Sequence, residues 1–124
     1  MQVYDWNKAT PEPITELYKR TTTQSKNMSV ARLEVKKGAA TRQHRHKQEE
    51  VIILLQGEWL FHLPNGDVTL RPNQMLTIEA GTEHSSEVLE DVVAIDVCTP
   101  TREDWINGED RDLHYDPYQE LWAV

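Results

Sequence analysis

The stretch from Gly38 to Gly57 reads GAATRQHRHKQEEVIILLQG and places two histidines and a glutamate directly before an apolar run. Residues two apart in an extended strand point to the same side, so His44 and His46 present their imidazoles together. Glu50 lies at a further even offset and can return to that side after a tight bend. The run from Val51 to Leu55 is typical of a strand buried on both faces.

Two or three imidazoles and a carboxylate form a ligand set that suits one divalent transition metal, such as Mn, Fe, Ni, Cu or Zn. His84 supplies a further imidazole from a later part of the chain. A His-x-His pair alone is more often part of a polar strand face, but the glycines that flank this one favour a metal site. The sequence therefore predicts that His44, His46, Glu50 and His84 converge on one ion.

The complete pattern G-x5-H-x-H-x3-E-x6-G resembles the first conserved motif of the cupin superfamily. The second cupin motif is G-x5-P-x-G-x2-H-x3-N. It keeps Gly81 and His84 here, whereas Asn73, Glu79 and Val88 replace its first glycine, its proline and its asparagine. Asn adopts the left-handed conformation more readily than most residues, so we expect the turn at Asn73 to persist. The resemblance implies an all-β, double-stranded β-helix, the cupin jelly-roll barrel.

Short apolar or alternating segments separated by turn residues are typical of a sandwich or barrel. The sequence Pro-Asn-Gly-Asp at residues 64–67 favours a hairpin. No long segment has helical periodicity. The expected strands are 28–35, 42–46, 50–55, 58–63, 67–70, 75–78, 85–89 and 92–98, with turns at 56–57 and 90–91.

The 124 residues are expected to form one domain, 1–124, with a barrel over about 28–100 and a C-terminal extension over 101–124. Residues 3–14 carry two prolines and read as an extended N-terminal arm. Large apolar residues of the arm and extension need burial: Val3, Tyr4, Trp6, Trp105, Leu121 and Trp122. The extension would therefore be a strap over the barrel or a contact to a second subunit, and we expect a homodimer.

Composition limits the partners. The formal net charge of -8 argues against nucleic acid, whose phosphates select basic surfaces. The sequence has no apolar stretch of membrane length and no signal-peptide start, so a cytoplasmic protein is expected. A single cysteine, Cys98, excludes an internal disulfide. A small-molecule substrate is the expected partner.

The segment 92–98 carries a carboxylate in its middle. In an extended strand, one face carries Val93, Ile95 and Val97, and the opposite face carries Ala94, Asp96 and Cys98. A buried carboxylate is costly unless it is paired or functional, so Asp96 is a candidate acid–base group, with a structural salt bridge as the alternative. If Asp96 faces the metal, the apolar set should pack between the sheets. Arg102 either offers its planar fork to a substrate carboxylate or is a surface arginine.

The segment DVCTPTREDW, from Asp96 to Trp105, narrows the resemblance. It is similar to the D-x-F-x-P-x-R-x-D segment of small single-domain cupins of the pectin-degradation KdgF type. Asp96, Pro100, Arg102 and Asp104 match, and Cys98 replaces the aromatic residue. The resemblance implies that the chain converts 4,5-unsaturated uronates into linear ketouronates, with Asp96 and Arg102 acting at the substrate.

Three functions stay open. The favoured one is a metal-dependent enzyme of the lyase, isomerase or hydrolase type that acts on a small carboxylated or sugar-acid substrate. The second is an Fe(II)- and O2-dependent cupin dioxygenase, and the third is a non-catalytic, metal-dependent binding or sensor domain. Two further histidines are interpreted as ordinary residues: His62 as a strand histidine, unless its face lines the pocket, and His114 as a surface residue.

Overall fold

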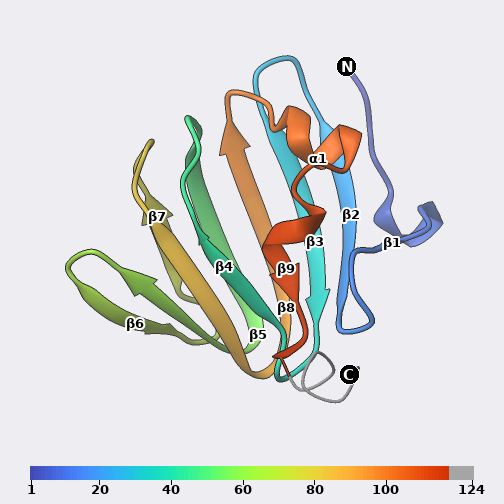
Figure 1. Ribbon diagram of the computed structural model, residues 1–124. Helices are drawn as coiled ribbons and strands as arrows, with labels where there is room; N and C mark the ends of the chain where they lie inside the picture. Colours follow the sequence, from blue (N-terminus) through green and yellow to red (C-terminus); the bar gives the residue numbers. More distant parts are fainter. Residues whose placement is uncertain (118–124) are drawn as a thin grey trace.

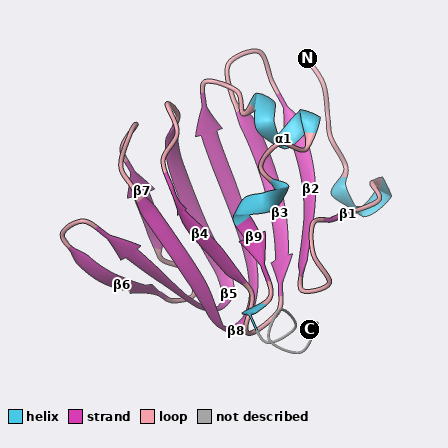
Figure 2. Cartoon of the chain, viewed as in Figure 1, coloured by secondary structure: helices cyan, strands magenta, loops and turns pink. Residues whose placement is uncertain are grey.

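The computed structural model describes residues 1–117, which form a strongly curled antiparallel sheet with short helices near one end (Figures 1 and 2). This confirms the predicted all-β class. The elements are η1 (Trp6–Lys8), β1 (Glu12–Pro13), β2 (Tyr18–Gln24), β3 (Ser29–Val35), β4 (Ala40–His44), β5 (Glu49–Leu63), β6 (Gly66–Leu70), β7 (Met75–Ile78), β8 (His84–Thr99), α1 (Glu103–Asn107), η2 (Arg111–Leu113) and β9 (His114–Tyr115). No helix among these residues is long and apolar enough to cross a membrane.

Two long strands, β5 and β8, pair with each other along nearly their whole length and connect the two layers of the barrel. The part of β8 over residues 92–98 lies between β3 and the first part of β5. The part over 84–88 lies between β4 and the second part of β5, which also pairs with β6. We expected each long strand as two strands joined by a turn, and that was wrong.

The bend between the layers lies inside the strands, at Gly57. The register of β5 against β8 shifts on both sides of this residue. Gly57 has a φ of 95°, and a Cβ atom there would collide with the backbone carbonyl of Asp91. Only glycine combines this conformation with so close an approach, so the chain bends without leaving the ladder.

The strand β2 was not predicted. Its sequence YKRTTTQ has no apolar alternation, yet it pairs with β3 from Tyr18↔Val35 to Gln24↔Ser29. Tyr18 and Arg20 are buried. The reason is long-range: Arg20 Nη2 donates to Asp110 Oδ1 at 3.0 Å, which compensates the buried charge from ninety residues away. Local periodicity cannot reveal such a strand.

The core fills the space between the layers. Ala31, Leu33 and Val35 are buried on one face of β3, as predicted. Aromatic and aliphatic side chains from β5 complete it, among them Leu54, Trp59 and Phe61. The left-handed turn expected at Asn73 is present, with a φ of 68°.

The alternation along β8 decides which groups face the interior. Ala94, Asp96 and Cys98 are buried, whereas the alternate residues 93, 95 and 97 are half-buried on the outer face. The polar set therefore faces inward, as the metal-site hypothesis required. The expectation that Val93, Ile95 and Val97 pack between the sheets was wrong, because alternate residues of a strand point to opposite faces and Asp96 already lies on the inner one.

Residues 101–117 form a strap that crosses the barrel (Figure 1). The helix α1 buries Trp105, and β9 pairs with β4 through Thr41↔His114. The strap is thus held to both β2 and β4. The N-terminal arm contributes η1 and the short β1, which pairs with β2 of the same chain. Leu121 and Trp122 lie outside the described residues.

Candidate metal centre and active site

Three histidines meet at one end of the barrel. His44 ends β4 and His84 begins β8, and the two are register partners. His46 follows β4 by two residues. The ring centroid of His84 lies 4.3 Å from that of His44 and 5.1 Å from that of His46. Ring nitrogens of all three lie within 4.8 Å of one another, so the group can hold a metal ion.

Each of the three imidazoles is oriented by the backbone. In every case Nδ1 lies against a carbonyl oxygen, which can only accept, so Nδ1 carries the proton and Nε2 keeps its lone pair. The carbonyls belong to Arg42 for His44, Gln48 for His46 and Thr82 for His84, at 2.8, 3.0 and 2.8 Å. Burial lowers the pKa of His44 to about 4, which keeps this imidazole neutral at pH 7. The tautomer is the one that a metal requires.

Glu50 completes the set from the start of β5. Its Oε1 lies 3.3 Å from His46 Nε2 and 3.4 Å from His84 Nε2. Ligand atoms about 2.1 Å from one ion are roughly 3.0 Å apart in an octahedron and roughly 3.4 Å apart in a tetrahedron. The observed separations therefore match those of ligands around a single ion.

His46 gives an independent test of whether a metal fits. Its Nε2 is sealed from solvent and has no hydrogen-bond partner in residues 1–117, because this nitrogen and the nearby Glu50 oxygen both present lone pairs. A buried nitrogen with a free lone pair is unfavourable unless something binds it. A divalent cation would satisfy this atom and offset the Glu50 charge. The residues present thus fit a metal ion.

A second carboxyl group lies beside Glu50. Asp96 on β8 is the register partner of Ile52 on β5. Glu50 lies two residues before Ile52 and therefore points to the same side of β5. Burial, the charge of Glu50 and a hydrogen bond with it raise the pKa of Asp96 well above its usual range. Burial alone would also raise the pKa of Glu50, but the hydrogen bond that Glu50 accepts from Asp96 acts in the opposite direction, and the pKa is lowered. The pair therefore holds one proton, on Asp96.

Arg102 is buried at 3% exposure, so it is not a surface arginine. Its Nε and Nη2 each donate to the carboxylate of Asp104 at 2.8 Å. Its Nη1 lies 3.7 Å from Cys98 Sγ, a weak acceptor. Its guanidinium also covers the ring of Trp105 at 4.9 Å. One edge of the fork is thus occupied, and Nη1 remains for another acceptor.

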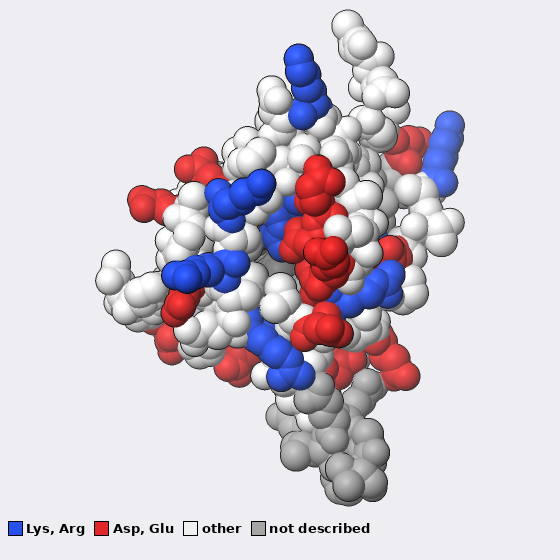
Figure 3. Space-filling view, turned by 45° about the horizontal axis from the view of Figure 1, so that its top comes forward, with Lys and Arg blue, Asp and Glu red and all other residues white. Residues whose placement is uncertain are grey.

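These groups line a common cavity of about 40 Å³. The lining residues include His44, Glu50, His84, Asp96 and Arg102. Asp96 and Arg102 are therefore brought to the same space as His44, His84 and Glu50. Figure 3 looks onto this end of the barrel and shows a central hollow with Asp and Glu gathered on one side and Lys and Arg opposite.

Sequence reasoning missed part of the cavity wall. Tyr18 comes from the unpredicted β2, and Trp59 lies on a predicted strand but was not proposed as a site residue. His114 was interpreted as a surface residue, which was wrong: its side chain lines the cavity and donates from Nε2 to Asp110 at 3.1 Å. The spacing of four residues between Asp110 and His114 does not by itself indicate burial. It becomes informative only once the strap is known to cover the barrel.

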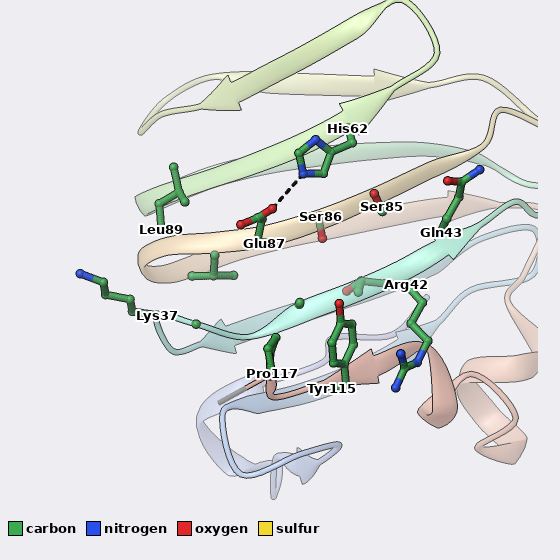
Figure 4. A pocket seen from close by; sticks show the side chains of 14 residues that line it. Lys37, Arg42, Gln43, His62, Ser85, Ser86, Glu87, Leu89, Tyr115 and Pro117 are labelled. Carbon is green, nitrogen blue, oxygen red and sulfur yellow. Dashed lines mark hydrogen bonds and ion pairs between the residues drawn. The ribbon is translucent and has the colours of Figure 1, made fainter. Parts of the chain in front are cut away.

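His62 does not line this cavity. Its Nδ1 lies 2.8 Å from Asp67 Oδ1 and its Nε2 lies 2.9 Å from Glu87 Oε2. Figure 4 shows it pointing into a separate groove of about 440 Å³, whose other walls include Lys37 and Tyr115. The interpretation of His62 as an ordinary strand histidine agrees with this position. The two carboxylates raise its pKa.

Comparison with known proteins identifies the family. The Cupin_2 family profile, described as Cupin domain, matches residues 31–98, more than half of the chain. The chain therefore belongs to the cupin family, as its two motifs predicted. A comparison with curated proteins finds no match.

Solved structures share the fold. KdgF from Halomonas sp. superimposes with a TM-score of 0.78 at 19% identity, covering 84% of this chain and 99% of that one. An RmlC-like cupin from Shewanella frigidimarina superimposes with a TM-score of 0.78 at 19% identity, and the match covers 85% of this chain and 96% of that one. Ectoine synthase from P. lautus superimposes with a TM-score of 0.75 at 15% identity, and the match covers 93% of this chain and 88% of that one. These likenesses confirm the cupin jelly-roll barrel.

Proposed function

We propose that the protein is a metal-dependent enzyme that acts on a small carboxylated or sugar-acid substrate. The substrate we propose is a 4,5-unsaturated uronate, converted into the linear ketouronate. One observation carries the proposal. A carboxyl group with a raised pKa, Asp96, and a buried cation, Arg102, share a cavity with three of the four proposed metal ligands, His44, His84 and Glu50. Proton transfer, carboxylate binding and oxygen polarisation are thereby available in one place.

His44, His46, His84 and Glu50 would hold the ion. When bound, a divalent metal supplies a Lewis acid that polarises substrate oxygen and stabilises negative charge on it. Glu50 enters this role ionised, because Asp96 retains the proton of the pair. Mn, Fe, Ni, Cu and Zn all accept this mixture of imidazole and carboxylate.

The conversion is an isomerisation with a simple proton balance. The hydroxyl on C1 loses its proton, the bond between C1 and the ring oxygen breaks, and the aldehyde forms. The enol system left at C5 takes up a proton at C4 and becomes the ketone. Asp96 is the group that we assign to this proton transfer, since it is protonated, buried and beside the ligand set.

Arg102 is assigned to the substrate carboxylate. Its Nε–Nη2 edge is occupied by Asp104, so it would bind through Nη1 rather than through a bidentate fork. Asp104 and the Trp105 ring hold the guanidinium in place. The weak contact of Nη1 with Cys98 is easily exchanged for a charged oxygen.

The strap must shift for a sugar acid to bind. A cavity of about 40 Å³ has room for about one or two water molecules, far less than a six-carbon acid needs. Trp105, Leu113 and His114 of the strap form part of its wall. We therefore expect these residues to move outward when substrate enters and to close over it afterwards.

The small cavity also supports a second candidate, an Fe(II)-dependent dioxygenase. Dioxygen and a small co-substrate need less room than a uronate does. Activity that requires both Fe(II) and O2 would favour this candidate, whereas the isomerisation requires no O2. A binding or sensor domain would show affinity for a ligand without turnover.

The test uses metal-loaded protein and the unsaturated uronate released by a pectate lyase. We expect the ultraviolet absorbance of the conjugated C4=C5 bond to decay faster with protein than without it. Protein treated with chelator is the control. Equal decay rates for the loaded protein, the chelated protein and buffer alone would reject the uronate activity.

A further inference from the structure

We propose that the Tyr18 hydroxyl and the Trp59 indole N–H form a donor subsite of the metal cavity that binds an uncharged oxygen of the substrate, a carbonyl or hydroxyl. The inference deepens the proposed function and rests on it, since the same cavity must receive the substrate. It assigns a specificity-determining role to two residues outside the metal-ligand set and outside the segment from Asp96 to Trp105.

Tyr18 presents a hydroxyl with no protein partner. The residue is 5% exposed and lines the cavity together with His44 and His84. Within residues 1–117 its hydroxyl makes no hydrogen bond, and it is not one of the polar atoms that are sealed from solvent without a partner, so it is free to bind a group that enters the cavity. Burial raises its pKa far above the ordinary value, so the group stays a neutral O–H donor.

Trp59 supplies a second donor without a partner. It is 4% exposed and lines the same cavity. Its Nε1 is buried and has no acceptor in the described part of the chain. An indole nitrogen can only donate, so an oxygen acceptor is what it lacks. Its ring packs against Phe61 at 4.8 Å, which holds the indole in place.

The strap fixes the position of Tyr18. The His114 ring packs against it, with centroids 4.4 Å apart. His114 is held at both nitrogens, by Asp110 at 3.1 Å and by Thr41 Oγ1 at 3.2 Å. Asp110 in turn accepts from Arg20, two residues along β2 from Tyr18. When the strap is closed, this network holds the donor in place against the ligand, which favours affinity.

The charges of the cavity decide which part of a ligand meets these donors. Arg102 is the cation that lines it, so a substrate carboxylate is drawn there. Tyr18 and Trp59 are neutral donors and suit the uncharged oxygens of the same molecule. A ligand with a carboxylate alone would leave both donors without a partner. The subsite therefore selects hydroxy or oxo acids over simple carboxylic acids.

The experiment uses the full chain loaded with Zn, the variants Tyr18→Phe and Trp59→Phe, and Tyr4→Phe as a matched control. Tyr4 is 52% exposed on the N-terminal arm. The probes are the unsaturated uronate and its unreactive relative galacturonate, with acetate as a simple carboxylic acid. Binding is followed through the indole N–H signals in a ¹⁵N–¹H spectrum, where Trp59→Phe identifies the Trp59 signal.

We expect a uronate to shift the Trp59 signal downfield and acetate to leave it in place. Tyr18→Phe should weaken uronate binding about tenfold. It should keep its metal and melt at the same or a higher temperature, because a hydroxyl without a protein partner does not stabilise the fold. A Tyr18 hydroxyl with a merely structural role predicts a lower melting temperature and unchanged affinity, and that result would overturn the inference.

The two proposals can fail separately. Uronate binding with the predicted shift but no turnover would reject the enzyme activity and leave the donor subsite standing. Turnover with wild-type affinity in Tyr18→Phe, and no movement of the Trp59 signal, would reject the subsite alone. Binding of neither uronate by the wild-type protein would reject both.

Discussion

Glu50 and Asp96 form a buried carboxyl pair on adjacent strands, and the pair holds a single proton on Asp96. Their carboxyl oxygens lie within 4.8 Å of each other, and two like charges so close in a buried site are strongly disfavoured, so one group stays neutral. Glu50 faces the histidines, at 3.3 Å from His46 Nε2 and 3.4 Å from His84 Nε2. The pair thus separates a ligand role from an acid role.

Replacing Asp96 tests the acid role. Asp96→Asn keeps the shape and the hydrogen bond to Glu50 but cannot transfer a proton. We expect the fold and the metal content to be retained and kcat to fall by roughly two to four orders of magnitude. Steady-state kinetics, elemental analysis and a melting curve of the same preparation measure the three properties. If the variant unfolds while activity per folded molecule is unchanged, Asp96 is structural.

Arg102 tests the carboxylate role. Arg102→Ala should raise KM much more than it lowers kcat, because the lost contact is made in both the bound and the transition states. Some loss of stability is expected as well, since Asp104 loses its partner. Arg102→Lys keeps the charge and separates the two effects. An unchanged KM in both variants would show that the carboxylate binds elsewhere.

The contacts of Asp110 with Arg20 and His114 lead to a prediction about how stability depends on pH. Burial by itself would raise the pKa of Asp110, but hydrogen bonds from His114 and Arg20 outweigh it and hold the pKa far below its usual value. A group whose pKa is lower in the folded state stabilises the fold above its unfolded pKa of about 3.9 and loses that contribution as the pH falls.

We therefore expect Asp110→Asn to lower the melting temperature strongly at pH 7 and by progressively less as the pH falls below about 4, with part of the difference already lost at pH 3. Asp112→Asn is the matched control, since Asp112 is an exposed neighbour on the same strap. A difference between wild type and Asp110→Asn that stays constant from pH 7 to pH 3 would contradict this assignment.

A homodimer remains a prediction. Of the apolar residues on which it was based, Trp105 is buried within its own chain, whereas Val3 and Tyr4 are exposed. The outer face adds Leu55 and Met75, exposed by 48% and 59%. We expect light scattering at micromolar concentration to give twice the mass of one chain. The mass of a single chain would reject the dimer.

Local geometry predicted only that His44 and His46 lie together, whereas Glu50 and His84 were added from the spacing of the cupin motifs. A spacing of two places His44 and His46 together, and the flanking glycines fix the bends around them. Asp96 could be singled out because the alternation along residues 92–98 places a carboxylate within an otherwise apolar strand. Arg20, Tyr18 and His114 were not predictable, because their burial depends on contacts across ninety or more residues, between a polar strand and the strap. The periodicity of apolar residues along a short segment carries no information on such long-range contacts.

The metal content of two histidine variants tests the central claim most directly. His46 is one of the four proposed ligands, whereas His62 is a histidine of the same barrel that binds two carboxylates outside the cavity. Elemental analysis after purification should find about one transition-metal ion per chain in the wild type and in His62→Ala, and little in His46→Ala. Equal metal in both variants, or none in folded wild-type protein supplied with each candidate ion, would contradict the claim.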